Sequence, residues 1–76
     1  MFGSELSPAQ KRMLLHIVNW GGLGSSAEDD TGLQGAAFEA VLESLRTRGY
    51  ANDDYEPTGK ALDASAALKL LARTRT

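Results

Sequence analysis

The chain has 76 residues, of which 42% are apolar and 24% are charged, and its formal net charge at pH 7 is −2. This length supports one small hydrophobic core, so we expect a single domain over residues 1–76. Without cysteine and with one histidine, the chain has no disulfide framework or thiolate metal site, and a histidine-based catalytic or metal cluster is not expected. It contains no apolar stretch of the roughly 20 residues that a membrane span needs and no recognisable signal peptide. We therefore expect a cytoplasmic protein with no membrane partner.

Charge is distributed unevenly along the chain. Residues 1–27 carry a net charge of +1, residues 28–63 carry −6 and residues 64–76 carry +3. Cations are favoured near the C-terminus of a helix, which explains the basic end of the chain; the alternative is a tail that makes weak contacts with an anion. A nucleic-acid-binding module usually presents a basic stripe, whereas the central segment here is acidic.

The first helix is predicted to begin after Ser7. Ser7 is a good N-cap, Pro8 suits the first helical position and Gln10 can close a capping box. Apolar residues then recur with helical spacing, at Met13, Leu14, Ile17 and Val18. The pair Gly21-Gly22 predicts the end of this helix.

Two further helical segments follow. Residues 25–34 predict either a short helix capped by Ser25 or Ser26, or an open loop. Residues 35–48 carry the strongest helical pattern of the chain, with apolar positions at Phe38, Val41, Leu42 and Leu45. A glycine directly after this segment predicts its end.

The last part of the chain predicts a small hairpin and a helix. Residues 50–51 and 55–56 flank an Asn-Asp-Asp turn and predict a very short β-hairpin. Pro57 ends it, because proline is disfavoured inside a strand ladder. Thr58 can cap a final helix of about residues 60–73, which is rich in alanine and leucine.

The order of these elements and three motifs resemble the winged helix-turn-helix of MarR- and PadR-type regulators. Thr31–Gln34 is similar to the turn before the recognition helix, and Leu45–Tyr50 is similar to the end of that helix. Tyr55–Lys60 resembles the aromatic–Thr–Gly signature after the wing, with a shorter spacing between Thr58 and Gly59 than is usual. The resemblance implies a mainly α fold with a small β-hairpin: three helices, a short wing and a C-terminal helix.

The resemblance also implies a small DNA-binding transcriptional regulator whose recognition helix lies in the major groove of duplex DNA. The candidate DNA contacts are Gln34, Arg46, Arg48, Lys11 and Arg12. Gln34 is the one plausible base reader on the helix, whereas Glu39 and Glu43 would face a phosphate backbone with one charge per ~1.7 Å. The Asn-Asp-Asp tip of the wing is acidic as well.

The alternative is that the fold serves as a protein-interaction module, such as a phage- or plasmid-type inhibitor or adaptor, that does not bind DNA. Small residues on the third helix allow the close backbone approach that suits protein packing. The candidate interface residues on this helix are Gly35, Ala36, Ala37, Glu39, Ala40 and Glu43. Fold alone does not decide between these two functions.

We also expect a homodimer. The first and last helices have more apolar faces than one small core can cover. The residues expected at this interface are Leu15, Trp20, Leu68, Leu70 and Leu71. In the alternative arrangement, the two helices cover each other within one chain.

No catalytic or metal site is predicted, so we expect neither an enzyme nor a cofactor. His16 has no partner nucleophile or orienting carboxylate at a recognisable spacing. The acidic pairs at 29–30 and 53–54 lack the spacing of an EF-hand loop, and capping and turn chemistry explain them. The glycine-rich segment 21–24 lacks the Lys-Ser/Thr ending of a phosphate-binding loop.

Overall fold

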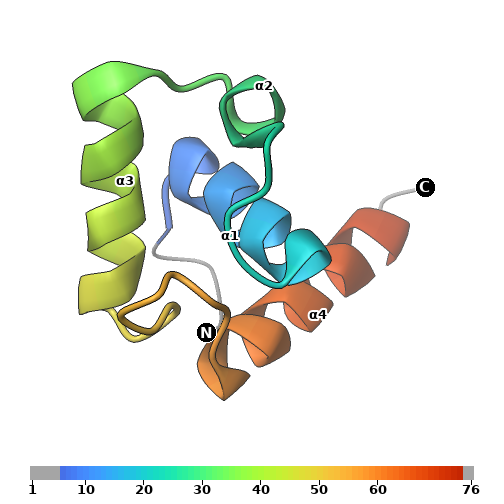
Figure 1. The fold of residues 1–76 in the computed structure, drawn as a ribbon. Helices are drawn as coiled ribbons and strands as arrows, with labels where there is room; N and C mark the ends of the chain where they lie inside the picture. Colours follow the sequence, from blue (N-terminus) through green and yellow to red (C-terminus); the bar gives the residue numbers. More distant parts are fainter. Residues whose placement is uncertain (1–5, 75–76) are drawn as a thin grey trace.

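A computed structural model describes residues 6–74 of the chain, with side chains through residue 69 (Figure 1). Its four helices are α1 (Pro8–Trp20), α2 (Ala27–Thr31), α3 (Gly35–Thr47) and α4 (Gly59–Thr74). α1 lies in the centre and contacts each of the other three helices (Figure 1). The prediction of a mainly helical fold is confirmed.

The start of α1 forms as its sequence predicts. The backbone N–H of Gln10 donates to Ser7 Oγ at 3.2 Å, and the N–H of Ser7 donates to Gln10 Oε1 at 2.8 Å. This reciprocal pair is the capping box, and Pro8 occupies the first turn. The Gln10 amide also donates to Ser44 Oγ at 3.0 Å, so the same residue caps α1 and ties its N-terminus to α3. Gly21 ends the helix in the left-handed region, with φ 71°.

Residues 27–31 are helical, which answers the question that the sequence leaves open. Ser26 occupies the N-cap of α2, but its hydroxyl makes no capping bond and donates instead to Asp30 Oδ2 at 3.0 Å. The left-handed Gly32 ends this single turn.

The C-terminus of α3 is closed by a backbone hydrogen bond. The N–H of Tyr50 donates to the carbonyl of Leu45 at 2.9 Å, across the left-handed Gly49.

The segment between α3 and α4 is a tight loop in which one antiparallel bridge joins Ala51 to Pro57. Within residues 6–74 the ladder does not extend beyond this bridge, so the predicted hairpin of residues 50–51 and 55–56 is not confirmed, and Pro57, predicted to end it, is itself the bridge partner. Pro57 has no N–H to donate, and Asn52 Oδ1 accepts the N–H groups of Asp54 and Glu56, both at 2.9 Å. A side chain therefore takes the donors that a second strand would need. We call residues 50–57, where the resemblance implies a wing, the wing loop.

The core lies where α1 meets the other helices and the wing loop. Its largest fully buried side chains are Met13, Leu14, Ile17, Leu45 and Tyr50. α4 contributes the fully buried Ala61 and Ala64, and small residues allow close packing of α4 against α1. Truncation of one of the large aliphatic side chains of the core to alanine should lower the free energy of unfolding by about 2–5 kcal/mol.

The predicted dimer residues have different surroundings. Trp20 is 55% exposed, Leu15 is half-buried, and Leu68 is partly buried and packs against the core. The side chains of Leu70 and Leu71 lie outside the described residues. No helix in the described part of the chain is long and apolar enough to cross a bilayer.

Candidate functional site

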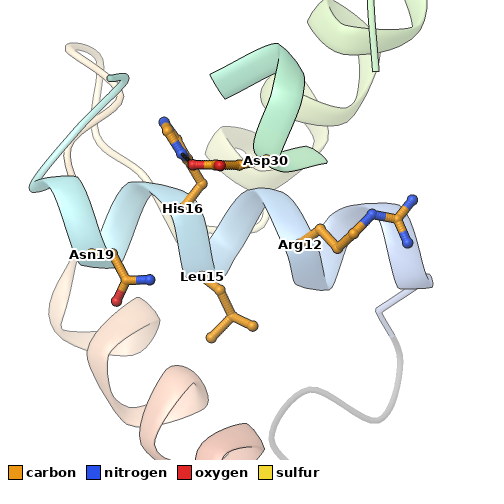
Figure 2. Close-up of a pocket in the computed structure, with 5 residues that line it drawn as sticks. All are labelled: Arg12, Leu15, His16, Asn19 and Asp30. Atoms are coloured by element: carbon orange, nitrogen blue, oxygen red, sulfur yellow. Dashed lines mark hydrogen bonds and ion pairs between the residues drawn. The ribbon is translucent and has the colours of Figure 1, made fainter. Parts of the chain in front are cut away.

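His16 lies at the centre of a polar cluster that joins α1 to α2 (Figure 2). Its side chain is fully buried, and Nδ1 lies 2.8 Å from Asp30 Oδ2. Its Nε2 accepts the backbone N–H of Gly24 at 2.9 Å. Because Nε2 is an acceptor, the proton of the neutral ring must sit on Nδ1, from which it is donated to Asp30. We call His16, Gly24 and Asp30 the histidine latch.

In the histidine latch both imidazole nitrogens make hydrogen bonds that hold the α1–α2 linker and α2 against α1. An Asp-His pair orients a general base only when the far nitrogen is free to take a proton, and here the amide of Gly24 occupies Nε2. Hydrogen bonds from His16, and then from Ser26, hold the pKa of Asp30 below its usual value. No three His, Cys, Asp or Glu side chains of the described residues lie close enough together to hold a metal ion.

Trp20 closes the histidine latch from one side. Its ring stacks on the imidazole of His16, with centroids 5.8 Å apart and planes inclined by 29°. A Cβ on Gly24 would lie 2.2 Å from Trp20 Cδ2, a distance that real atoms do not reach. Glycine at this position therefore lets the linker pass under the indole while its N–H reaches the imidazole.

Arg12 fastens the other end of α2. Its Nε donates to the carbonyl of Thr31 at 2.9 Å, which satisfies one of the free carbonyls at the helix C-terminus. Arg12 also lines a hollow of about 300 Å³ with Leu15, His16, Asn19 and Asp30 (Figure 2). Arg12, one of the candidate DNA contacts, is thus hydrogen-bonded to another part of the same chain.

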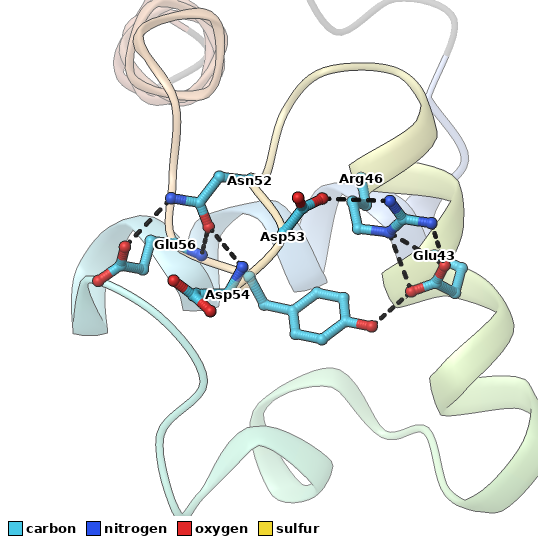
Figure 3. A network of polar contacts seen from close by, with 7 residues as sticks. Glu43, Arg46, Asn52, Asp53, Asp54 and Glu56 are labelled. Atoms are coloured by element: carbon cyan, nitrogen blue, oxygen red, sulfur yellow. Dashed lines mark hydrogen bonds and ion pairs between the residues drawn. The ribbon is translucent and has the colours of Figure 1, made fainter.

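A second polar cluster attaches the wing loop to α3 (Figure 3). Glu43 accepts from Arg46 Nη2 at 2.7 Å and from the Tyr55 hydroxyl at 2.5 Å. Arg46 Nη1 reaches Asp53 at 3.4 Å. Tyr55 has φ 61°, in the left-handed region that few residues other than glycine and asparagine adopt. We call Glu43, Arg46, Asp53 and Tyr55 the carboxylate clamp.

The carboxylate clamp surrounds its one cation with two carboxylates. The hydrogen bond from Arg46, followed by that from Tyr55, lowers the pKa of Glu43. The same carboxylate raises the pKa of the Tyr55 phenol, because the Glu43 hydrogen bond favours its neutral form. Arg46 therefore serves as a bridge between α3 and the wing loop, and the cluster as a whole carries negative charge.

A groove of about 560 Å³ runs beside the carboxylate clamp, between the α1–α2 linker, α3 and the wing loop. Its lining is apolar with two acidic residues, and consists of Leu23, Phe38, Glu39, Leu42, Glu43 and Tyr55. Leu23 is 43% exposed and Glu39 is exposed. We call this feature the α3 groove, which no single sequence motif indicates because its lining comes from three segments.

The structure does not bring the five candidate DNA contacts together. Gln34 lies at the start of α3 and Arg46 near its end. The two are twelve positions apart, which is ~18 Å along the helix axis. Lys11 is half-buried and Arg48 is exposed. Within the described residues neither of these two side chains has a hydrogen bond or an ion pair.

Most of the candidate protein-interface residues of α3 are exposed. Glu43 is half-buried in the carboxylate clamp. The others are all exposed, namely Gly35, Ala36, Ala37, Glu39 and Ala40. The first half of α3 therefore exposes several small side chains, and its Glu39 also lines the α3 groove.

Comparison of the chain with protein-family models, with curated protein sequences and with solved structures found no match. The residues with a chemically distinctive environment in the described part are those of the histidine latch, the carboxylate clamp and the α3 groove. Two of these clusters hold segments in place, and the third is an open surface. The α3 groove is therefore the candidate functional site.

Proposed function

We propose that this chain is a winged-helix module that acts by binding another protein through α3 and the wing loop. The order α1, α2, α3, wing loop and α4 supports the winged-helix assignment. The open surface of α3 and the adjoining α3 groove support a protein partner, because exposed apolar side chains beside small residues suit close packing.

The observation that carries this proposal is the charge around α3. The one described cation of the carboxylate clamp, Arg46, is held by Glu43 and Asp53. Glu39 projects from the exposed face of the same helix. A recognition helix in the major groove would bring these carboxylates toward phosphates spaced one charge per ~1.7 Å, which is repulsive. A protein surface imposes no such penalty.

An NMR titration of isotope-labelled protein with generic duplex DNA, at low and then at higher salt, tests the proposal. We expect the amide signals of residues 34–43 to stay unchanged at both salt concentrations. Shifts confined to these residues and the wing loop, with affinity that falls steeply as salt rises, would refute it.

A DNA-binding regulator is the second candidate function, and one observation favours it. Gln34 is exposed at the N-cap of α3 and its side chain makes no capping bond, so its amide is available to an adenine edge. Lys11 and Arg48 are the described cations best placed to contact phosphate. This candidate predicts the positive outcome of the same titration.

A further inference from the structure

We infer that the α3 groove binds a short amphipathic protein segment that inserts one large apolar side chain and carries lysine or arginine beside it. The inference rests on the proposed function and specifies the chemistry of the partner. It follows from the apolar lining of the groove and from the charge of its edge.

The residues that line the groove explain why the partner segment should insert a large apolar side chain, which we call the anchor. Leu42 is 5% exposed and lies at the floor, while Leu23 is 43% exposed and stands at one edge. The aromatic ring of Tyr55 closes another edge, and its hydroxyl is fixed by Glu43. A volume of about 560 Å³ accommodates a leucine or phenylalanine side chain with part of its backbone. Burial of such a side chain removes Leu23 and the anchor from water together.

The charge beside the groove explains why the partner segment should carry lysine or arginine next to its anchor. Glu39 is exposed and has no hydrogen bond or ion pair with another described residue. Glu43 is paired with Arg46, but Asp53 adds a second carboxylate to the same cation, so two carboxylates and one guanidinium leave the carboxylate clamp negative beside the groove. A segment with lysine or arginine beside its anchor meets the charge of Glu39 and of the carboxylate clamp, whereas an acidic segment is repelled.

The wing loop is held ready for such a segment. Asn52 accepts two backbone N–H groups of the loop, and its amide donates to Glu56 Oε1 at 3.1 Å (Figure 3). Together with the carboxylate clamp, these bonds fix Tyr55 before any partner arrives. A surface that is already ordered loses less conformational entropy on binding.

The test uses two short amphipathic peptides with the same leucine pattern, one with lysine and one with glutamate at the polar positions. Each is titrated into the labelled full chain, and duplex DNA is titrated in parallel. We expect the lysine peptide to shift the amides of Leu23, Phe38, Leu42 and Tyr55, and the glutamate peptide to leave them unchanged. Leu23→Ser should weaken the binding of the lysine peptide without changing the charge of the protein.

Two charge reversals provide the matched comparison. Glu39→Lys should raise the Kd of the lysine peptide about tenfold, since it replaces an attraction by a repulsion at the groove edge. Asp29→Lys makes the same change of net charge at an exposed position of α2 that does not line the groove, and should leave the Kd within about twofold. Both positions are exposed, so dispersed amide spectra will verify that the variants fold.

The possible results separate the inference from the proposed function. Equal binding of both peptides in the groove would overturn the basic-partner inference and leave the protein-binding function standing. Equal weakening by Glu39→Lys and Asp29→Lys would overturn it too, because binding would then follow net charge alone. No binding of the lysine peptide overturns it as well. Shifts of α3 with DNA, and none with either peptide, would refute the proposed function itself.

Discussion

Substitution of Gly24 by alanine should reveal how closely the α1–α2 linker is fitted to Trp20. The added Cβ would lie 2.2 Å from Trp20 Cδ2 and 2.4 Å from Cε3. The indole is 55% exposed, so we expect it to swing outward and the backbone to stay in place. The molecule then loses the stack on His16 and part of the indole burial, a cost of about 1–2 kcal/mol in the free energy of unfolding.

A second variant changes the sign of this effect. The three atoms nearest to the added Cβ all belong to the Trp20 ring, and the φ of Gly24 is not in the left-handed region. In a Trp20→Ala background, Gly24→Ala should therefore stabilise the fold by about 0.4–1 kcal/mol, because alanine restricts the unfolded chain more than glycine does.

Urea denaturation of the wild type, the two single variants and the double variant measures this cycle. Circular dichroism at helical wavelengths is the suitable signal, since it remains available when the tryptophan is removed. Trp20 is the single tryptophan of the chain, so its fluorescence reports the outward movement separately in Gly24→Ala. The same destabilisation by Gly24→Ala in both backgrounds would refute the reasoning, because the cost would then not come from the indole.

Three further predictions concern the caps, the histidine latch and the dimer. Ser7→Ala should lower the free energy of unfolding by about 1 kcal/mol through loss of the capping box, and Ser7→Gly should cost less; equal stability in urea denaturation of Ser7→Ala and wild type would contradict this. The pKa of Asp30 is lowered in the folded state, so its stabilisation is complete above the unfolded value of about 3.9 and is lost as the pH falls through the lower folded value. Asp30→Asn should therefore flatten the acid side of the stability profile, and an unchanged slope below about pH 4 would count against the latch. The sequence predicts a homodimer, and in that case Leu15→Glu should give a folded monomer in analytical ultracentrifugation, whereas unfolding would place Leu15 in the core.

The features that sequence reasoning predicted well depend on neighbours in the chain. The capping box of Ser7 and Gln10, the left-handed stop at Gly21 and the cap of α4 by Thr58 all use residues within four positions of each other. Local hydrogen-bonding chemistry determines these elements. The core side of α3 follows from helical periodicity in the same way.

The features that sequence reasoning missed depend on contacts across a turn. Asp30 was explained by capping, yet it pairs with His16, fourteen residues earlier. Arg46 is a candidate DNA contact in the sequence, and only the path of the wing loop brings Asp53 to it. Residues 50–51 and 55–56 around the Asn-Asp-Asp turn predict a hairpin, but Asn52 Oδ1 accepts two N–H groups of the loop and one bridge forms. Periodicity shows which face of a helix is buried and does not show which polar groups meet.

The histidine latch also has a consequence for the order of folding. Its two bonds span eight and fourteen residues, and the bond from Arg12 to Thr31 spans nineteen. Short loops of this kind close at low entropic cost, whereas the bond from Lys69 to Asn19 spans fifty. We therefore expect α1, its linker and α2 to gather early as one cooperative unit, to which α4 docks later. In hydrogen exchange this unit should open as a block, and the amide of Gly24 should report its opening.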